Sequence, residues 1–435
     1  MKIASRFEQK CVSAQEPRQL PLRLIDAIGP FFRDLHKERI NWSKIPFAHL
    51  PPEENERRRC FERIAVDLRV FAERVRAVGY NAVSLDDVAH LADHPWYEAE
   101  IRAMIASYRQ EFRCLFDILR DQGLAIYLTM DVLSLTPRLK EKLYGDERRI
   151  NGFLSELLDQ LLHDFPEIAG IIMRIGESDG QDVKDRFRSE LHIRTPGQLN
   201  RLLETLLPIF ERQGRHLILR TWTVGAYPVG DCIWRQSTLT RSLEGITSQA
   251  FILSMKYGES DFFRYLPLNP QFFATKVQKI IELQARREYE GCGEYPSFIG
   301  GDYEHYARQL QQAENMVGIS VWCQTGGWVP FRRLAFLDDG AVWTEINAWV
   351  SLRVVAQGCS AREAVADYCQ AQGIEQEEAV WELLQLSEAV VKELLYVPEY
   401  ACEQRFFRRV RIPPLLAVYW NTIFINHSMR KLMRH

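Results

Sequence analysis

Short apolar runs alternate with amphipathic helical segments along most of this chain. Seven runs have the length and composition of buried strands: Tyr80–Leu85, Leu124–Thr129, Gly170–Arg174, Leu217–Trp222, Ala250–Met255, Ile280–Leu283 and Val317–Trp322. Most are separated by segments of helical periodicity, such as Glu53–Val78, which places Phe61, Ile64 and Leu68 on one face. Strands that alternate with helices predict a parallel sheet.

The N-terminal region supplies the remaining strand that a closed sheet needs. We predict a helix near Leu22–Leu35 and then a first strand at Arg39–Phe47, which is rich in apolar and β-branched residues. Eight strand–helix units predict an α/β fold of the (β/α)8 TIM-barrel type. The glycine-rich fingerprints of nucleotide-binding folds are absent from the sequence.

The pattern changes near Leu334 to helices without strands. Helical periodicity covers Ala341–Gln357, Ala361–Gln372 and Gln376–Tyr396. Ser360 and Glu363 have the spacing of a capping box before the second of these helices. We therefore predict a barrel over residues 1–335 and a helical C-terminal subdomain over residues 336–435.

Composition and charge exclude several classes of protein. The 435 residues are 46% hydrophobic and carry a net charge of −3, which gives no general attraction to nucleic acid or to an anionic membrane. The basic, aromatic run Arg405–Arg411 is interpreted as a packing segment rather than a nucleic-acid patch. We find neither a signal-peptide core nor a run long enough to span a membrane, and expect a cytoplasmic protein.

Cysteine and histidine spacing gives no sign of a metal or cofactor. The nine cysteines form no C-x-x-C pair, and the histidines show no metal-binding spacing. We expect no metal and no cofactor. The sequence leaves the oligomeric state open, and a homodimer is one option.

Charged and aromatic residues follow nearly every predicted strand. They are Asp86, Asp87, Asp131, Arg174, Glu177, Arg220, Trp222, Lys256, Glu259, Asp261, Glu288, Glu290, Trp322, Gln324 and Trp328. In a barrel of parallel strands these positions meet at the C-terminal face, where such barrels keep their active sites. Aromatic rings stack on sugar faces, and paired carboxyl groups are what glycoside hydrolysis needs. The rim therefore predicts a carbohydrate site.

Three carboxyl groups are the candidates for catalysis. Glu177 lies between Gly176 and Gly180 and is our candidate general acid, while Asp261 and Glu288 could hold the attacking water between them. Simpler explanations stay open, because charged residues after strands are often solvated.

The other rim residues are candidates for binding substrate. Arg174, Arg220 and Lys256 would offer positive charge to a uronate, and Asp87, Asp131, Trp222, Trp322 and Trp328 would line the site. The arginines could instead pair with rim carboxylates, and the indoles could belong to the core.

Several of these segments resemble one known family. Ile281–Gly291 reads I-E-L-Q-A-R-R-E-Y-E-G and is similar to E-L-Q-I-T-Q-E-Y-L-G in the α-glucuronidases of glycoside hydrolase family 67. Lys256 precedes Asp261 by five residues, as in that family's Q-I-K-N-G-P-I-D-F, and Gly327–Phe336 is similar to its N-W-Y-A-F-G-R-L-A-W. Arg220-Thr-Trp matches its W-R-A-F, and Glu177 corresponds more loosely to the glutamate of K-A-N-S-E-G.

The resemblance covers roughly residues 81–350 and implies an inverting glycosidase built on a (β/α)8 barrel. It implies Glu177 as the general acid and Asp261 with Glu288 as the pair that holds water. It also implies that Lys256 and Arg220 contact the substrate's carboxylate or hydroxyls. The family's N-terminal β-domain has no counterpart in the first 35 residues, and we expect it to be lacking.

The sequence thus predicts a glycoside hydrolase that acts on a small oligosaccharide, with a uronic acid as one possible component. A retaining enzyme that uses Glu177 and Glu288 is a mechanistic alternative, and a carbohydrate-binding barrel without activity is an alternative of another class. A lyase or isomerase on the same barrel is disfavoured, since it would need a basic residue that the sequence does not place.

Overall fold

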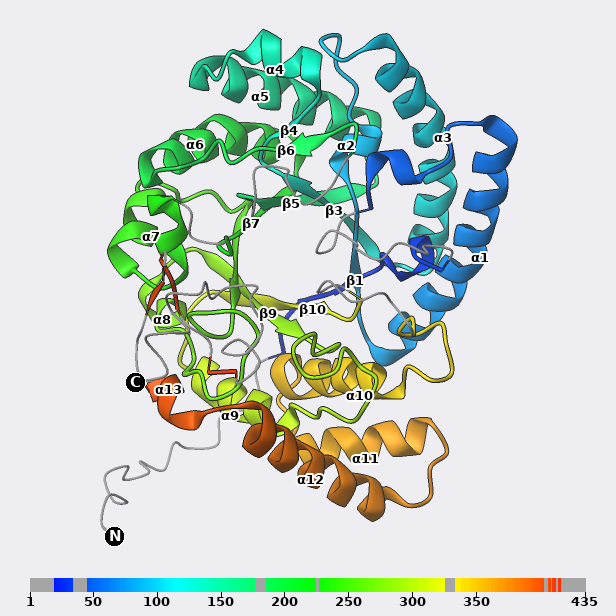
Figure 1. Cartoon of the computed structure of the whole chain (residues 1–435), viewed down its shortest axis with the longest axis vertical. Helices are drawn as coiled ribbons and strands as arrows, with labels where there is room; N and C mark the ends of the chain where they lie inside the picture. Colours follow the sequence, from blue (N-terminus) through cyan, green and yellow to red (C-terminus); the bar gives the residue numbers. More distant parts are fainter. Residues whose placement is uncertain are drawn as a thin grey trace, which may run out of the picture.

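Eight parallel strands close into a barrel in the order β1-β10-β9-β8-β7-β5-β3-β2 (Figure 1). The computed structural model describes residues 19–33, 45–176, 185–223, 227–324, 333–402, 406–407, 409–411 and 414–415. The barrel strands are β1 (Leu22–Asp26), β2 (Ala82–Leu85), β3 (Ala125–Asp131), β5 (Ile168–Arg174), β7 (His216–Arg220), β8 (Phe251–Lys256), β9 (Gln278–Gln284) and β10 (Met316–Trp322). The predicted (β/α)8 fold is confirmed.

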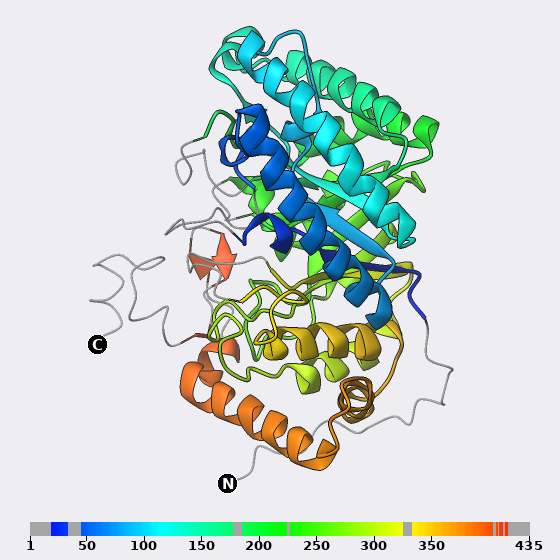
Figure 2. The same ribbon diagram turned by 90° about the vertical axis from the view of Figure 1, so that its right-hand side faces the viewer.

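Helices surround the barrel on its outer side (Figures 1 and 2). They are α1 (Glu54–Val78), α2 (Val88–Leu91), α3 (Ala99–Asp121), α4 (Pro137–Leu143), α5 (Glu147–Asp164), α6 (Pro196–Gln213), α7 (Gln236–Ser242), α8 (Gln271–Ala274), α9 (Gly300–Leu310) and α10 (Val342–Val350). Between β8 and β9 the only helix is the four-residue α8, so a long loop covers that side of the C-terminal face. Short 3-10 turns lie at Gly29–Phe31, Phe47–His49 and Pro228–Ile233, and small strands pair as β4 (Ser134–Leu135) with β6 (Arg188–Ser189).

Local sequence signals set the ends of these helices. Thr195 and Gln198 form a capping box at the start of α6, and Pro196 occupies the first turn, where its missing N–H costs nothing. Gly79 ends α1 in a left-handed conformation with φ 116°, which a residue with a Cβ rarely adopts. The chain can therefore turn at once from α1 into β2.

The first strand differs from the sequence prediction. Leu22–Asp26 was expected to be helical, but it forms β1 and pairs in parallel with both β10 and β2. Of the predicted strand Arg39–Phe47, residues 39–44 lie outside the described residues, and Phe47 begins a 3-10 turn. The carboxylate of Asp26 accepts hydrogen bonds from the backbone N–H groups of Cys323 (2.5 Å) and Gln324 (3.0 Å), just beyond β10.

The C-terminal helices continue the same core. The predicted helix Ala341–Gln357 is α10 followed by a π-helical turn, Ser351–Ala356, and its residues pack with those of the barrel. Tyr80 donates a hydrogen bond to the carbonyl of Ala348 at 2.7 Å, so α10 is bound to the base of β2. The capping box of Ser360 and Glu363 is confirmed at the start of α11 (Ala361–Ala371).

Beyond α11, helix α12 (Glu377–Leu395) crosses the lower edge of the molecule in Figure 2, and α13 (Pro398–Cys402) follows it. A final hairpin pairs β11 (Phe406–Phe407) with β12 (Val410–Arg411). The division of the chain at residue 335 stays a prediction.

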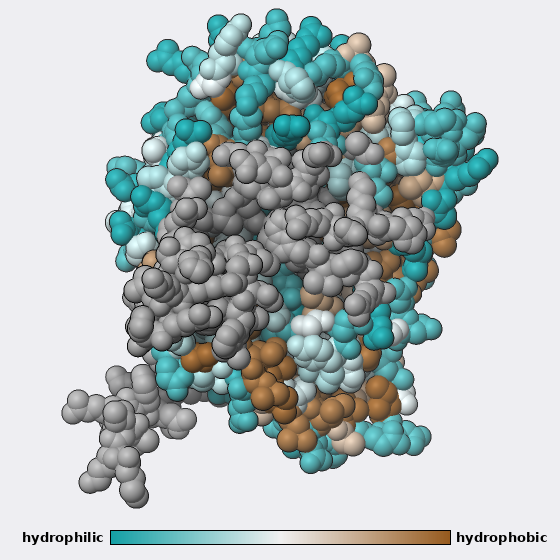
Figure 3. Space-filling model, viewed as in Figure 1, coloured by the Kyte–Doolittle hydropathy of each residue, from teal (hydrophilic) through white to brown (hydrophobic). Residues whose placement is uncertain are grey.

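On the face drawn in Figure 3, the coloured surface is largely hydrophilic near the top and sides, and apolar residues gather towards the lower edge. The exposed large apolar side chains of α12 are Leu383, Leu386, Val390 and Leu394. Within the described ranges, no helix is long and apolar enough to cross a membrane.

Candidate active site

A buried polar layer lies directly above the apolar interior of the barrel. The interior cluster contains Leu24, Ala82, Tyr127, Ile172, Ile218, Ile252 and Ile280, one residue from each of seven strands. Because side chains alternate along a strand, the residue two positions further on points into the barrel as well. Those residues are Asp26, Ser84, Thr129, Arg174, Arg220, Ser254 and Glu282, and all are buried. This set, the polar layer, forms the base of the C-terminal face.

Arg220 and Glu282 form the centre of the polar layer. The guanidinium of Arg220 donates two parallel hydrogen bonds to Glu282, each of 2.9 Å. Ser254 donates to the same carboxylate at 2.7 Å, and Trp322 donates from its indole N–H at 3.3 Å. Burial raises the pKa of Glu282, but Arg220 and the other donors outweigh it, and the pKa lies below its ordinary value. This buried ion pair is therefore retained at neutral pH.

A second ion pair joins strands β3 and β5. Arg174 lies 2.9 Å from Asp131 and 3.6 Å from Asp87, and all three side chains are buried. Asp131 also accepts a hydrogen bond from Ser189. Asp87 accepts from the backbone N–H of Ala89 at 2.8 Å and begins α2.

Lys256 and Asp261 are paired at the end of β8. The Lys256 ammonium lies 2.5 Å from the Asp261 carboxylate and 3.7 Å from the centre of a Trp222 ring. The Tyr289 hydroxyl donates to the other oxygen of Asp261 at 2.7 Å, and the backbone N–H of Phe262 donates to the first at 2.9 Å. Asp261 is thus fixed by donors on both of its oxygens.

Glu288 lies in different surroundings from Asp261. Its Oε1 accepts from the Gln284 amide at 3.0 Å, and its own N–H donates back to the Gln284 side chain at 3.0 Å. Its Oε2 is buried and has no hydrogen-bond partner among the described residues. Burial and the negative charge of Asp261 raise the pKa of Glu288 to about 8. This carboxyl group is mainly protonated at neutral pH.

The structure groups most of the predicted site residues at the C-terminal ends of the strands. Around β7 to β10, contacts join Arg220 to Trp322, and Lys256 to Trp222 and Asp261. Glu288 follows β9 and is bound by Gln284, the last residue of that strand. Arg174, Asp87 and Asp131 lie around β2 to β5. Each predicted cation is paired with a carboxylate of the rim, as the simpler explanation allowed for the arginines. Glu177 and Trp328 lie outside the described residues, and their assignments stay predictions.

Sequence reasoning missed several residues of this site. Glu282 interrupts an apolar run, and a glutamate inside a predicted buried strand was the available signal. Asp26 was missed together with its strand. Gln284 and Tyr289 hold the two carboxyl groups, but neither residue type marks such a role in a sequence. Within the described residues, no group of three or more His, Cys, Asp or Glu side chains is arranged to hold a metal ion.

Comparisons with known proteins support the fold. No protein-family model matches the sequence, and no curated protein matches it. A GH138 enzyme targeting pectin rhamnogalacturonan II is similar in structure, with a TM-score of 0.55 and 15% identity over 89% of this chain and 44% of that one. A family 89 glycoside hydrolase from Clostridium perfringens has a TM-score of 0.47 and 11% identity, over 84% of this chain and 41% of the other.

The chain thus spans less than half the length of these two similar structures. At such identities, the likeness to the GH138 enzyme shows a shared fold. The finer resemblance to glycoside hydrolase family 67 stays a prediction.

Proposed function

We propose that the protein is a glycoside hydrolase in which Asp261 and Glu288, the candidate catalytic pair, act on one glycosidic bond. The observation that carries this proposal is their unlike surroundings on neighbouring strands. Asp261 is held by Lys256 and Tyr289, whereas Glu288 has a raised pKa and a buried oxygen that no described residue contacts by a hydrogen bond. Carboxyl groups in such unlike settings can take different roles around one attacking water, and glycoside hydrolysis requires more than one carboxyl group.

The proposed mechanism is inverting. Asp261, as a carboxylate, would accept a proton from the attacking water, and the free oxygen of Glu288 would help to orient that water. Glu177, outside the described residues, would protonate the leaving oxygen, as the family resemblance implies. A fold shared with an enzyme that targets pectin rhamnogalacturonan II is consistent with a carbohydrate substrate.

The cationic side chains of the rim affect whether a negatively charged substrate can bind. Arg174, Arg220 and Lys256 are each within 2.9 Å of a carboxylate oxygen, so a uronate would compete with a protein carboxylate for each of them. A small oligosaccharide remains the proposed substrate, and both neutral glycosides and uronides belong in the test.

The proposal is tested with a panel of α- and β-linked aryl glycosides and aryl uronides. Asp261→Asn and Glu288→Gln should each lower kcat by about 100-fold or more, since each removes a group that acts in the transition state. Glu294→Gln is the matched control, because Glu294 lies in the same loop and its carboxylate is 4.0 Å from Arg333, a weak ion pair. NMR of the first product anomer should show inversion.

Hydrolysis that survives in both variants would contradict the assignment of the pair. A retained anomer would favour the double-displacement alternative. Tight sugar binding by the wild type without turnover of any substrate would favour the carbohydrate-binding alternative.

A further inference from the structure

Two buried carboxylates flank the candidate catalytic pair in the sequence. Glu259 precedes Asp261 by two residues, and Glu290 follows Glu288 by two. Glu259 is 7% exposed and Glu290 is fully buried, and both carboxylates are engaged by arginine side chains. Each is bound by a side chain from the C-terminal segment, which here means the described residues 396–402, 406–407 and 409–411.

Arg411 binds the loop that carries Asp261. Its guanidinium donates to Glu259 at 2.9 Å, and the Ser260 hydroxyl donates to the Arg411 carbonyl at 3.2 Å. The Arg411 guanidinium also donates to the carbonyl of Ala401 at 2.6 Å. Arg411 is 2% exposed. Removal of one partner from a buried ion pair strongly destabilises the folded protein, because the other charge is left buried and unpaired.

The hairpin that carries Arg411 is itself anchored on the barrel. The indole N–H of Trp234 donates to the carbonyl of Arg409 at 3.0 Å, and the rings of Trp234 and Phe406 lie 4.2 Å apart. Arg409 pairs with Asp231 at 3.0 Å, away from the loop of Asp261. The hairpin is therefore held on the barrel by Trp234, through a backbone carbonyl and the Phe406 ring, and this anchor does not involve the Arg409 side chain.

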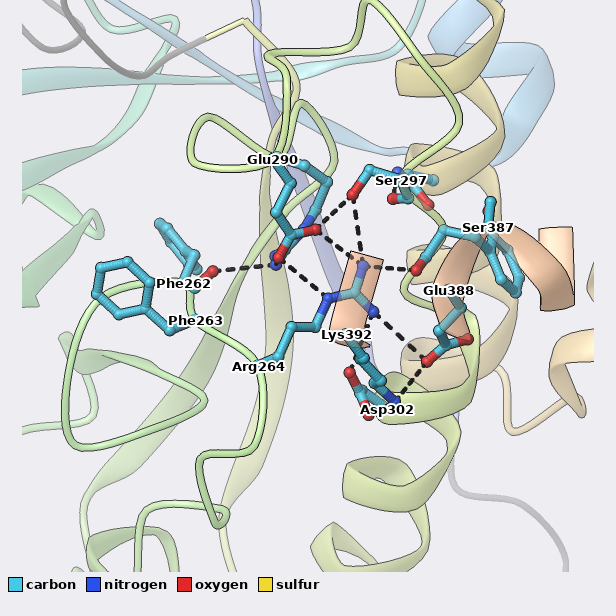
Figure 4. A network of polar contacts seen from close by, with 12 residues as sticks. Phe262, Phe263, Arg264, Glu290, Ser297, Asp302, Ser387, Glu388 and Lys392 are labelled. Atoms are coloured by element: carbon cyan, nitrogen blue, oxygen red, sulfur yellow. Dashed lines mark hydrogen bonds and ion pairs between the residues drawn. The ribbon is translucent and has the colours of Figure 1, made fainter. Parts of the chain in front are cut away.

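Glu290 is held in a similar way after Glu288. Figure 4 shows Glu290 between Arg264 and Ser297, and the Arg264 guanidinium donates to both Glu290 oxygens at 3.0 and 2.8 Å. Arg287 also binds Glu290, and the Tyr396 hydroxyl donates to it at 2.5 Å. Arg264 comes from the loop after β8 and Glu290 from the loop after β9, so this pair joins the two loops of the candidate catalytic pair.

We propose that the C-terminal segment is a positioning element of the active site, in which Arg411 fixes the Asp261 loop through Glu259 and Tyr396 fixes the Glu288 loop through Glu290. This inference rests on the proposed function for the identity of the pair. The reaction needs the two carboxyl groups at a set separation from one carbon, and small displacements of such groups reduce turnover strongly. Residues that act only through the loops should change kcat more than KM.

The test uses the full-length protein with Arg411→Gln and Tyr396→Phe, and Arg409→Gln as the matched control. Arg409 lies in the same hairpin, is 42% exposed and pairs outside the Asp261 loop. We expect Arg411→Gln to lower kcat by about 10- to 100-fold and Tyr396→Phe by about 10-fold, with KM changed less than about threefold. Arg409→Gln should leave both constants close to those of the wild type.

A second readout does not depend on activity. Backbone hydrogen exchange in residues 257–264 should become at least about tenfold faster in Arg411→Gln and should stay unchanged in Arg409→Gln. If Arg411→Gln does not fold, the double variant Glu259→Ala with Arg411→Ala takes its place, because it removes the link without leaving an unpaired buried charge.

The outcomes separate the two proposals. Exchange and kcat in Arg411→Gln that match those of Arg409→Gln would overturn the positioning role. A further outcome is that the wild-type protein hydrolyses no glycoside while Arg411→Gln still exchanges faster than the wild type. That result would support the positioning of the loop and contradict the proposed function.

Discussion

Glu288 is more easily protonated in the folded chain than in the unfolded chain. Its folded pKa of about 8 lies above the ordinary value of 4.5, because burial and Asp261 disfavour its charge. Below pH 4.5 the group is neutral in both states. Between pH 4.5 and 8 the folded state binds more protons, so the stability that Glu288 contributes is lost as the pH rises through this interval.

Glu288→Gln should therefore stabilise the protein at high pH only. The glutamine amide keeps the shape of the side chain and its contact with Gln284, but it carries no charge to bury. The thermal midpoint of the variant should equal that of the wild type near pH 4.5 and exceed it increasingly up to pH 8.5, measured by calorimetry in parallel buffers. Equal midpoints at every pH would show that Glu288 is not held neutral by the fold.

From the sequence, the positions of charged residues were easier to predict than the residues with which they form ion pairs. Arg220 and Lys256 are the last residues of β7 and β8, at strand ends that the sequence pattern indicates because an apolar run stops there. Their pairing with Glu282 and Asp261 was not predicted. The Arg220–Glu282 pair joins β7 and β9 across β8, so it depends on the register of three strands, which a single sequence does not contain. The Lys256–Asp261 pair depends on the conformation of the loop after β8.

Among the elements, β1 depends on a glycine in the strand beside it. A Cβ added at Gly318 in β10 would lie 2.3 Å from the carbonyl oxygen of Leu22, closer than any ordinary contact. Backbone atoms of two paired strands cannot both move away without loss of hydrogen bonds. The pairing of β1 with β10 therefore requires glycine at this position.

Gly318→Ala should destabilise the protein by about 1–3 kcal/mol, the usual cost of an overpacked site. Gly152→Ala in α5 is the matched control, because a Cβ there meets nothing within 4 Å. The control should stabilise the protein by up to about 1 kcal/mol, since alanine favours helix over glycine. Urea unfolding of the wild type and both variants measures these changes in stability. Equal urea midpoints for Gly318→Ala and the wild type would contradict the requirement for glycine at this position.

The misassigned first strand shows where local patterns are insufficient. Leu22–Asp26 is followed by Ala27, Ile28, Phe31 and Phe32, and this spacing also suits one face of a helix. Every residue from Leu24 to Phe32 is buried, so neither a period of two nor a period of 3.6 stands out. The long helices, with polar outer faces and clear caps, were predicted within a few residues.

For the whole molecule, one buried ion network connects the barrel with α12. Arg264 contacts Glu290 in the barrel, Asp302 in α9 and Glu388 in α12, and Lys392 of α12 lies 2.7 Å from Asp302 (Figure 4). The fully buried Arg264 therefore links three parts of the chain that are distant in sequence.

Arg264→Gln should weaken α12 more than the far side of the barrel. Loss of one partner from a buried ion network typically costs about 3–5 kcal/mol. Hydrogen exchange should become faster in Glu377–Leu395, whereas α5, on the opposite side in Figure 1, should keep its protection. Uniform acceleration in both helices would show that the network does not stabilise α12 in particular.

The contact of Asp26 with the residues after β10 has a consequence for the order of folding. The two partners, Asp26 and Cys323, are 297 residues apart, and β1 has no second neighbour until β10 has been made. During synthesis β1 leaves the ribosome before the other barrel strands. Nearly three hundred further residues must be made before β1 can pair with β10 and the barrel can close. The strand made earliest is the one whose pairing is completed last, and closure of the barrel at β1 should be a slow step in refolding.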